Sequence, residues 1–219
     1  MASDSLVFED SNSVSDLANL LSRAKAIEDD GALLTVRGTA LAVYVPVLVP
    51  AQLGQGDYTI LGMRVHRLVK EAQSNACYSI AAIQDRLARM GQANTEFILP
   101  PVEENPVWAG ITVPMSGWVE AGNVADTELA AAAQSGIDAV AQALPENPGK
   151  PVVAQIRQRI WSAEMESTKA SLPLGAAFAM NALGFLSSGG QSRILRQGNW
   201  IRVSNGQGHV LLRRSASLL

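Results

Sequence analysis

The chain has 219 residues, of which 47% are hydrophobic and 17% are charged, and its formal net charge is −3 at pH 7. This composition excludes a disordered chain and predicts a folded protein with one large domain or two small ones. The net charge is too small to argue for a nucleic-acid partner or against one.

Acidic and basic residues gather at opposite ends of the chain. Residues 1–30 carry seven acids against Arg23 and Lys25, whereas six basic residues and no acid follow Glu166. Two interpretations remain open. Either the C-terminal end forms a functional basic surface, or the two oppositely charged ends face each other in the fold.

Several features favour a cytoplasmic protein without membrane contact. Cys77 is the only cysteine, so the chain cannot form a disulfide within itself, which fits a reducing compartment. The first eleven residues are acidic and have no long apolar core, unlike a signal peptide. The longest apolar run, around residues 172–186, contains Pro173 and Gly175 and is too short to cross a bilayer.

The first half of the chain has the pattern of a helix, three strands, a second helix and a fourth strand. Ser13 can cap the first helix, with Asp16 three residues later. Gly38 suits a turn between the first two strands. Proline has no backbone N–H, so the second strand, which contains Pro46, lies at a sheet edge or is bulged at that residue. The expected strands are residues 33–37, 41–49, 58–69 and 96–99, and the second helix is 79–90.

The region that joins the two halves is rich in proline and tryptophan. Residues 99–118 hold four of the ten prolines and two of the four tryptophans. A purely flexible linker would not place large apolar side chains here, so we expect a rigid domain join with Trp108 and Trp118 buried, one in each half. The predicted domains are therefore residues 1–105 and 106–219.

The second half predicts three helices followed by three short strands. Helices are expected at residues 126–144, from Pro151 to about 160, and from about 174 to 185, the last apolar all round and therefore buried. The expected fold class is α+β. It has an N-terminal αβββαβ half with an antiparallel sheet, and a C-terminal three-helix half closed by a small antiparallel β-meander in a winged-helix-like order.

The last strands predict one candidate binding face. With a two-residue loop at 198–199 and a four-residue loop at 205–208, alternation sorts the side chains onto two faces. One face is apolar apart from Arg196. The other carries the candidate anion- or partner-binding residues Arg193, Trp200, Arg202, His209 and Arg213. Guanidinium groups bind phosphate or carboxylate and an indole offers a stacking surface, but Arg202 or Arg213 could equally cover Trp200 through a cation–π contact.

Three segments resemble a known group of proteins. These are WAGITVPMSGW at residues 108–118, ALGFL at 182–186 and GNWIRVSNGQGHVLLR at 198–213. Together they are similar to a family of two-domain actinobacterial proteins whose domains have no known function. The resemblance covers most of the chain, implies a two-domain layout and carries over no activity.

The sequence offers no catalytic, cofactor or metal motif. His66 is expected to be a solvated strand histidine and Cys77 a small buried residue. The Gly-x-Gly at Gly54 precedes a strand rather than a helix, so it does not predict a dinucleotide site. The histidines and cysteine are too few for a structural zinc site. We expect no catalytic residues, no cofactor and no metal.

The sequence therefore favours a non-enzymatic cytoplasmic binding or adaptor protein, with a protein partner or a second copy of itself. The first alternative is a nucleic-acid-associated protein that binds through the basic Arg/Trp hairpin face. The second alternative is an enzyme of an unrecognised type.

Overall fold

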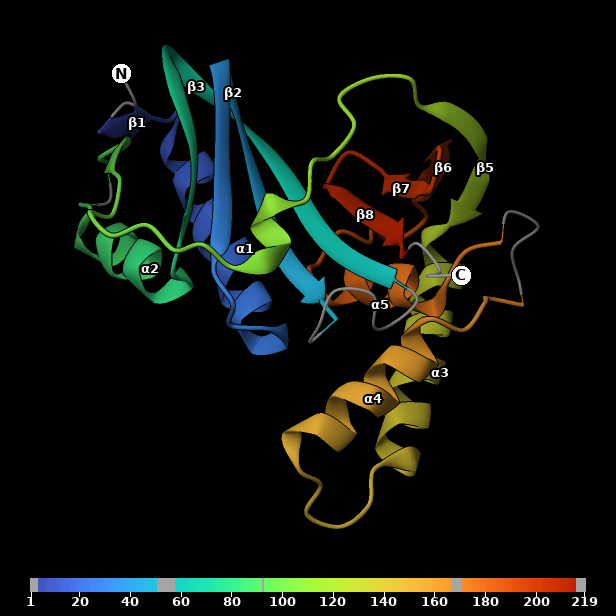
Figure 1. Ribbon diagram of the computed structural model, residues 1–219. Helices are drawn as coiled ribbons and strands as arrows, with labels where there is room; N and C mark the ends of the chain where they lie inside the picture. The colour runs from blue at the N-terminus through green and yellow to red at the C-terminus, as the bar shows by residue number, and fades with distance from the viewer. Residues whose placement is uncertain (1–3, 51–57, 92, 167–170, 216–219) are drawn as a thin grey trace. The chain divides into compact units, whose positions relative to one another are not determined.

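The computed structural model describes residues 4–50, 58–91, 93–166 and 171–215 (Figure 1). The chain divides into two compact units, Met1–Pro46 with Met63–Thr112, and Val47–Gly62 with Val113–Leu219. Strands β2 (Ala32–Leu48) and β3 (Tyr58–Tyr78) each begin in one unit and end in the other. The boundary predicted between residues 105 and 106 stays a prediction.

The first unit packs two amphipathic helices over a core of aliphatic and aromatic side chains. Its other elements are β1 (Ser5–Val7), which pairs antiparallel with β4 (Glu96–Ile98), and the 3-10 helix η1 (Val107–Gly110). Helices α1 (Ser11–Ile27) and α2 (Ile80–Arg89) contact each other. Their buried side chains recur at helical spacing: Leu17, Leu20, Leu21 and Ala24 in α1, and Ile80, Ile83 and Leu87 in α2.

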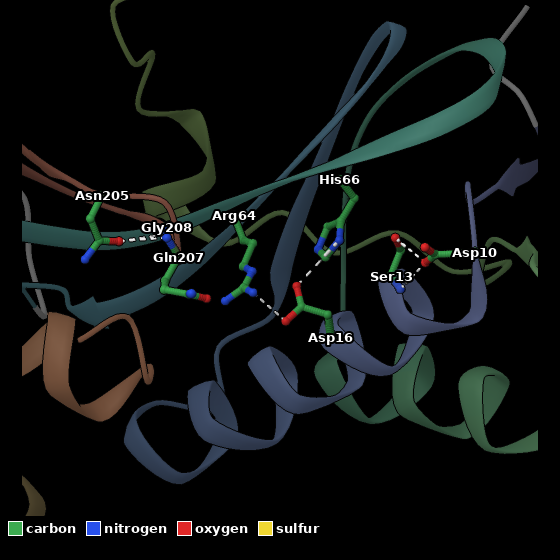
Figure 2. Close-up of polar contacts among 8 residues, drawn as sticks. All are labelled: Asp10, Ser13, Asp16, Arg64, His66, Asn205, Gln207 and Gly208. Atoms are coloured by element: carbon green, nitrogen blue, oxygen red, sulfur yellow. Dashed lines mark hydrogen bonds and ion pairs between the residues drawn. The ribbon is translucent and has the colours of Figure 1, made fainter. Parts of the chain in front are cut away.

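The first helix begins earlier than predicted. Asp10, not Ser13, is its N-cap, and the Asp10 Oδ1 atom accepts hydrogen bonds from the Ser13 backbone N–H at 2.7 Å and the Ser13 hydroxyl at 2.8 Å (Figure 2). A carboxylate is as good a cap as a hydroxyl and also interacts favourably with the helix dipole. The predicted cap therefore lies in the first turn.

The first two predicted strands form a single continuous strand. Residues 33–37 and 41–49 belong to the single strand β2, and Gly38 lies inside it with φ +60° rather than in a connecting turn. Strand β3 likewise continues to Tyr78 instead of ending near Val69, although its second half is polar. The prediction that Pro46 lies on an edge strand is confirmed, because β2 forms one edge of the sheet.

The second unit is built around an antiparallel sheet in the order β2-β3-β8-β7-β6-β5. Its strands, besides the ends of β2 and β3, are β5 (Val119–Ala125), β6 (Gln191–Gln197), β7 (Trp200–Ser204) and β8 (His209–Arg214). Its helices are α3 (Asp126–Ala143), α4 (Lys150–Trp161) and α5 (Leu174–Ala182). Helix α5 contacts α3, α4 and β8.

The predicted three-helix half closed by a small meander, in a winged-helix-like order, is wrong. Strands β6, β7 and β8 form the expected meander, but it lies in the middle of a six-stranded sheet. Strand β5, which precedes all three helices, pairs with β6, and β3 lies beside β8. Turn residues predict pairing between neighbouring strands, whereas these two pairings join strands far apart in sequence.

The prediction of a buried apolar third helix is confirmed. Helix α5 buries Gly175, Ala176, Ala177, Ala179 and Met180. A Cβ atom at Gly175 would collide with Ile60 of β3 and with Trp161 of α4. Because Gly175 has no Cβ atom, α5 can approach the sheet closely at this point.

A buried carboxylate ties three segments of the second unit together. Asp126, 2% exposed, accepts hydrogen bonds from the Ser187 backbone N–H at 2.9 Å and from the Ser192 hydroxyl at 2.7 Å. Asn205, in the turn between β7 and β8, donates to the Ser192 hydroxyl oxygen at 3.1 Å and to the Phe185 carbonyl at 2.7 Å. The start of α3, the segment before β6 and that turn thus share one network.

Asp126→Ala is expected to lower the free energy of unfolding by about 3 kcal/mol, because it leaves buried N–H and hydroxyl donors without their acceptor. Asp138→Ala, on the exposed side of the same helix where Asp138 accepts from Gln134, should cost no more than about 0.5 kcal/mol. Urea unfolding of the two variants measures the difference. Equal losses would show that the network does not stabilise the unit.

Candidate functional site

The candidate binding residues do lie on one face of the sheet. The register pairs Arg193 with Ser204, Leu195 with Arg202, and Gln197 with Trp200. It then pairs Ser204 with His209, Arg202 with Leu211, and Trp200 with Arg213. This is the predicted register, and it is confirmed. We call the surface that carries Arg193, Trp200, Arg202, His209 and Arg213 the arginine face; its role in binding stays a proposal.

The five residues differ in accessibility. Arg193 and Arg213 are exposed, whereas Arg202 and His209 are half-buried. Trp200 is only 6% exposed, so its indole offers no free surface for stacking. The arginine face therefore presents cations, and its predicted aromatic residue contributes to the core instead.

At the centre of the arginine face, Arg202 contacts Ser204 and His209. The Arg202 Nε–H donates to the Ser204 hydroxyl oxygen at 2.8 Å, and Arg202 Nη2 lies 3.2 Å from His209 Nδ1. The Ser204 Oγ atom lies 2.9 Å from the same Nδ1 atom. A guanidinium can only donate, so Nδ1 accepts and the imidazole proton is on Nε2. Both contacts hold the guanidinium without neutralising its charge.

His209 is kept neutral by its surroundings. Burial disfavours the charged imidazolium, and the cations Arg202 and Arg193 act in the same direction, so the pKa of His209 falls to about 4. Protonation would also place an N–H on Nδ1, facing the N–H groups of Arg202. The imidazole therefore remains an acceptor for Arg202 at neutral pH.

The aromatic partner of Arg202 is Trp118, not Trp200. The Arg202 guanidinium carbon lies 5.8 Å from the centroid of the half-buried Trp118 ring, within the range of a cation–π interaction. The indole Nε1–H of Trp118 donates to the Pro114 carbonyl at 3.0 Å, which fixes the ring. Gly117 lies against the side chain of Gln197 on β6. The segment that leads into β5 therefore contacts the arginine face.

Sequence reasoning missed two residues of this cluster. Ser204 could have been found, because the predicted register already placed it opposite both Arg193 and His209. Trp118 could not, because it precedes Arg202 by three helices and no local pattern joins them.

The two tryptophans of the predicted domain join belong to different units. Trp108, in η1, is 1% exposed and donates from its indole to the Asp30 carbonyl at 2.8 Å, within the first unit. Trp118 lies in the second unit and is less buried than predicted. Their role as a domain join stays a prediction.

His66 is buried rather than solvated, contrary to its prediction. Its side chain lies against Phe8, and its Nδ1 atom is 3.8 Å from Asp16, which also pairs with Arg64 at 2.6 Å (Figure 2). Burial lowers the pKa of His66 to about 4 and Arg64 acts in the same direction, although Asp16 opposes the shift. Within the described residues, its Nε2 atom has no hydrogen-bond partner. His66 is thus a neutral residue of the core.

Cys77 is buried at the end of β3, and its burial is as predicted. Desolvation and the nearby carboxylates of Glu104 and Asp30 raise the pKa of Cys77 to about 12, so the sulfur remains a thiol at neutral pH. The described residues contain no cluster of three metal-binding side chains. No helix within the described ranges is long and apolar enough to span a membrane.

The first unit also has an open groove of about 330 Å³ between α1 and α2. It is lined by Val14 and Ala18 from α1, by Leu87 from α2, and by Met90 and Asn94 beyond it, among others. None of its lining residues is charged. The groove therefore offers shape, some apolar surface and uncharged polar groups.

Two family models match the chain. One, domain of unknown function DUF8010, matches residues 1–110, and the other, domain of unknown function DUF8185, matches residues 113–217. The resemblance to a two-domain family without assigned function is thereby confirmed, while the actinobacterial origin stays a prediction. The curated proteins contain no match.

The fold is similar to that of solved sliding clamps. A sliding clamp, DNA polymerase III subunit beta, from Bartonella birtlesii matches with a TM-score of 0.56 and 9% identity, over 98% of this chain and 66% of that one. A putative DNA polymerase III beta subunit from Eubacterium rectale gives 0.55 and 8%, over 96% and 64%. The DNA polymerase sliding clamp of Caulobacter crescentus gives 0.53 and 11%, over 99% and 67%.

At these identities the likeness establishes the fold alone. The architecture is sliding-clamp-like, which replaces the expected winged-helix-like arrangement. This chain spans about two thirds of the length of the structures it matches, 64% for the Eubacterium rectale protein.

Both imidazoles are expected to remain neutral down to pH 5, because their pKa values are lowered to about 4 from the ordinary 6.5. Arg202→Gln should move the midpoint of His209 upward, since it removes a cation beside the ring, and should leave His66 unchanged. The chain has two histidines, so His66 serves as an internal control in an NMR titration. A midpoint near 6.5 for His209 in the unmodified protein would contradict the cluster geometry.

Proposed function

We propose that this chain, which belongs to the family described as domain of unknown function DUF8010, is a non-enzymatic, DNA-associated protein that holds a protein partner. The observation that carries the proposal is the likeness of nearly the whole chain to DNA polymerase sliding clamps. Because the chain spans about two thirds of those structures, DNA association and partner binding are both inferences from a shared fold. The proposed location is the cytoplasm.

The state of each reactive side chain supports a binding role over a catalytic one. The thiol of Cys77 is protonated and buried, and the pKa values of about 4 make both imidazoles weak bases at neutral pH. Ser204 and His209 are within hydrogen-bond distance, but Ser204 is 3% exposed and its oxygen already accepts from Arg202. A hydroxyl that a substrate cannot reach cannot act as a nucleophile.

The number of phosphate contacts needed for DNA association exceeds what the arginine face supplies. Three guanidinium groups neutralise about three phosphates, whereas proteins that hold DNA firmly neutralise roughly 6–10. Exposed cations also occur elsewhere in both units, among them Arg23, Arg89, Lys150 and Arg159. The proposed DNA contact therefore draws on cations outside the arginine face, against an overall charge of −3.

Binding of the full chain to a labelled duplex, followed by anisotropy, should weaken steeply with salt. Three contacts alone predict a slope of log K against log salt near −2.7, and the wider set of cations predicts a steeper one. No binding at about 50 mM salt would refute DNA association. A slope near −2.7 would favour the narrower hypothesis that nucleic acid contacts the basic hairpin face alone.

A second copy of the chain is the alternative to a different protein partner. Sedimentation of the protein over a range of concentrations separates the two, because self-association raises the apparent mass with concentration. A constant monomer mass would exclude the homodimer and leave the partner to be another protein.

A further inference from the structure

We infer that the arginine face is a docking surface for an extended acidic peptide segment of a partner protein. The inference rests on the partner-holding role proposed above and names the chemistry of that partner. It comes from the positions and charges of the side chains in β6, β7 and β8.

The three arginines lie on one diagonal of the sheet. The row runs from Arg193 on β6 to Arg202 on β7 and then to Arg213 on β8. Each step moves one strand across the sheet and two residues along it. Strands are about 4.8 Å apart and alternate residues about 6.8 Å apart, so neighbouring arginines are spaced by roughly 8 Å at the backbone. A row of cations therefore crosses the face over roughly 16 Å.

The two outer arginines of this row, Arg193 and Arg213, are exposed cations in a region rich in positive charge. Residues 191–214 contain five arginines and no acid. Within the described strands β5 to β8, the register places one acid on the same face, Glu120 on β5 opposite Leu195. In the part of the chain that the structure describes, neither Arg193 nor Arg213 belongs to an ion pair, and both are exposed.

The middle arginine is held in place before any ligand arrives. Ser204 and His209 fix the Arg202 guanidinium from one side, and the Trp118 ring lies over it at 5.8 Å. Because the imidazole is neutral, its contact orients Arg202 without repelling a carboxylate. An arginine already fixed loses less conformational freedom when it binds.

An acidic peptide fits this surface in both spacing and charge. In an extended segment, alternate side chains project to one side every 6.8 Å or so, and three carboxylates would each face one guanidinium, which binds carboxylate in a bidentate manner. Nucleic acid fits less well. Three contacts are few for a polyanion, and the whole chain carries a charge of −3, which repels a long polyanion more than a short acidic segment.

The probe is a fluorescent peptide of about nine residues with alternating glutamate and serine, tested on the full chain at about 50 mM salt. We expect binding to the unmodified protein, and no binding of the peptide in which glutamine replaces glutamate. Arg193→Ala/Arg213→Ala should weaken binding about tenfold, because each exposed ion pair contributes about threefold. Arg37→Ala/Lys70→Ala removes the same charge from exposed positions of the first unit and should change affinity less than twofold.

A charge exchange separates recognition from damage to the fold. Arg193→Glu/Arg213→Glu should lose the glutamate peptide and gain affinity for a matching lysine–serine peptide, which an unfolded protein would not do. Trp118→Leu should weaken the glutamate peptide severalfold through the loosened Arg202. Equal losses in the arginine-face and control variants, or no binding by the unmodified protein, would overturn the inference.

Measuring duplex DNA binding by the unmodified protein and the same variants distinguishes the proposed DNA association from the proposed peptide docking. Peptide binding without DNA binding would leave this inference standing and refute DNA association. DNA binding without peptide binding would refute this inference alone. If Arg193→Ala/Arg213→Ala lost DNA binding while the control variant kept it, the arginine face would be a nucleic-acid site. That result would also overturn the peptide-docking inference.

Discussion

The strict alternation of side chains in β6, β7 and β8 is the constraint on which the candidate site depends. Ile194, Ile201, Val203, Val210 and Leu212 are all buried on one side of these strands. Shifting any of these strands by one residue would place an arginine on the buried side, Arg193 from β6, Arg202 from β7 or Arg213 from β8. The cost of burying those charges fixes the register, and the same register places Arg193, Arg202 and Arg213 on the opposite side. The core therefore determines where the cations lie.

An arginine on the apolar side follows the same physical rule. Arg196 is on the apolar side, opposite Ile201, yet it is not fully buried, and its guanidinium donates to the Ser171 carbonyl at 2.7 Å. A long side chain can cover apolar surface with its methylene groups while its charged end finds an acceptor. Arg202 solves a similar problem with Ser204, His209 and Trp118. In both cases a half-buried guanidinium donates to neutral acceptors, among its other contacts.

Local patterns predicted local structure well, and failed where distant segments meet. The turns at Gly198 and Asn205 were sufficient for the register of the meander, because turn geometry sets the pairing of adjacent strands. The pairing of β5 with β6 depends on contacts across three intervening helices, so no window of sequence contains it. For the same reason the sequence did not predict that Trp118 belongs to the candidate site. It also predicted His66 to be solvated, because the contact with Phe8 that helps to bury it is long-range.

Proteins that share a fold have similar backbone geometry even where their surface charges differ. The identity to the sliding clamps is only 8–12%, although the TM-scores are 0.55 and 0.52. The likeness therefore concerns the scaffold and not the chemistry of its surface. Arg193 and Arg213 are exposed on a face whose position the core has fixed, so their side chains can be changed with little effect on packing. For that reason the charge exchange at these two positions tests recognition itself and leaves the fold aside.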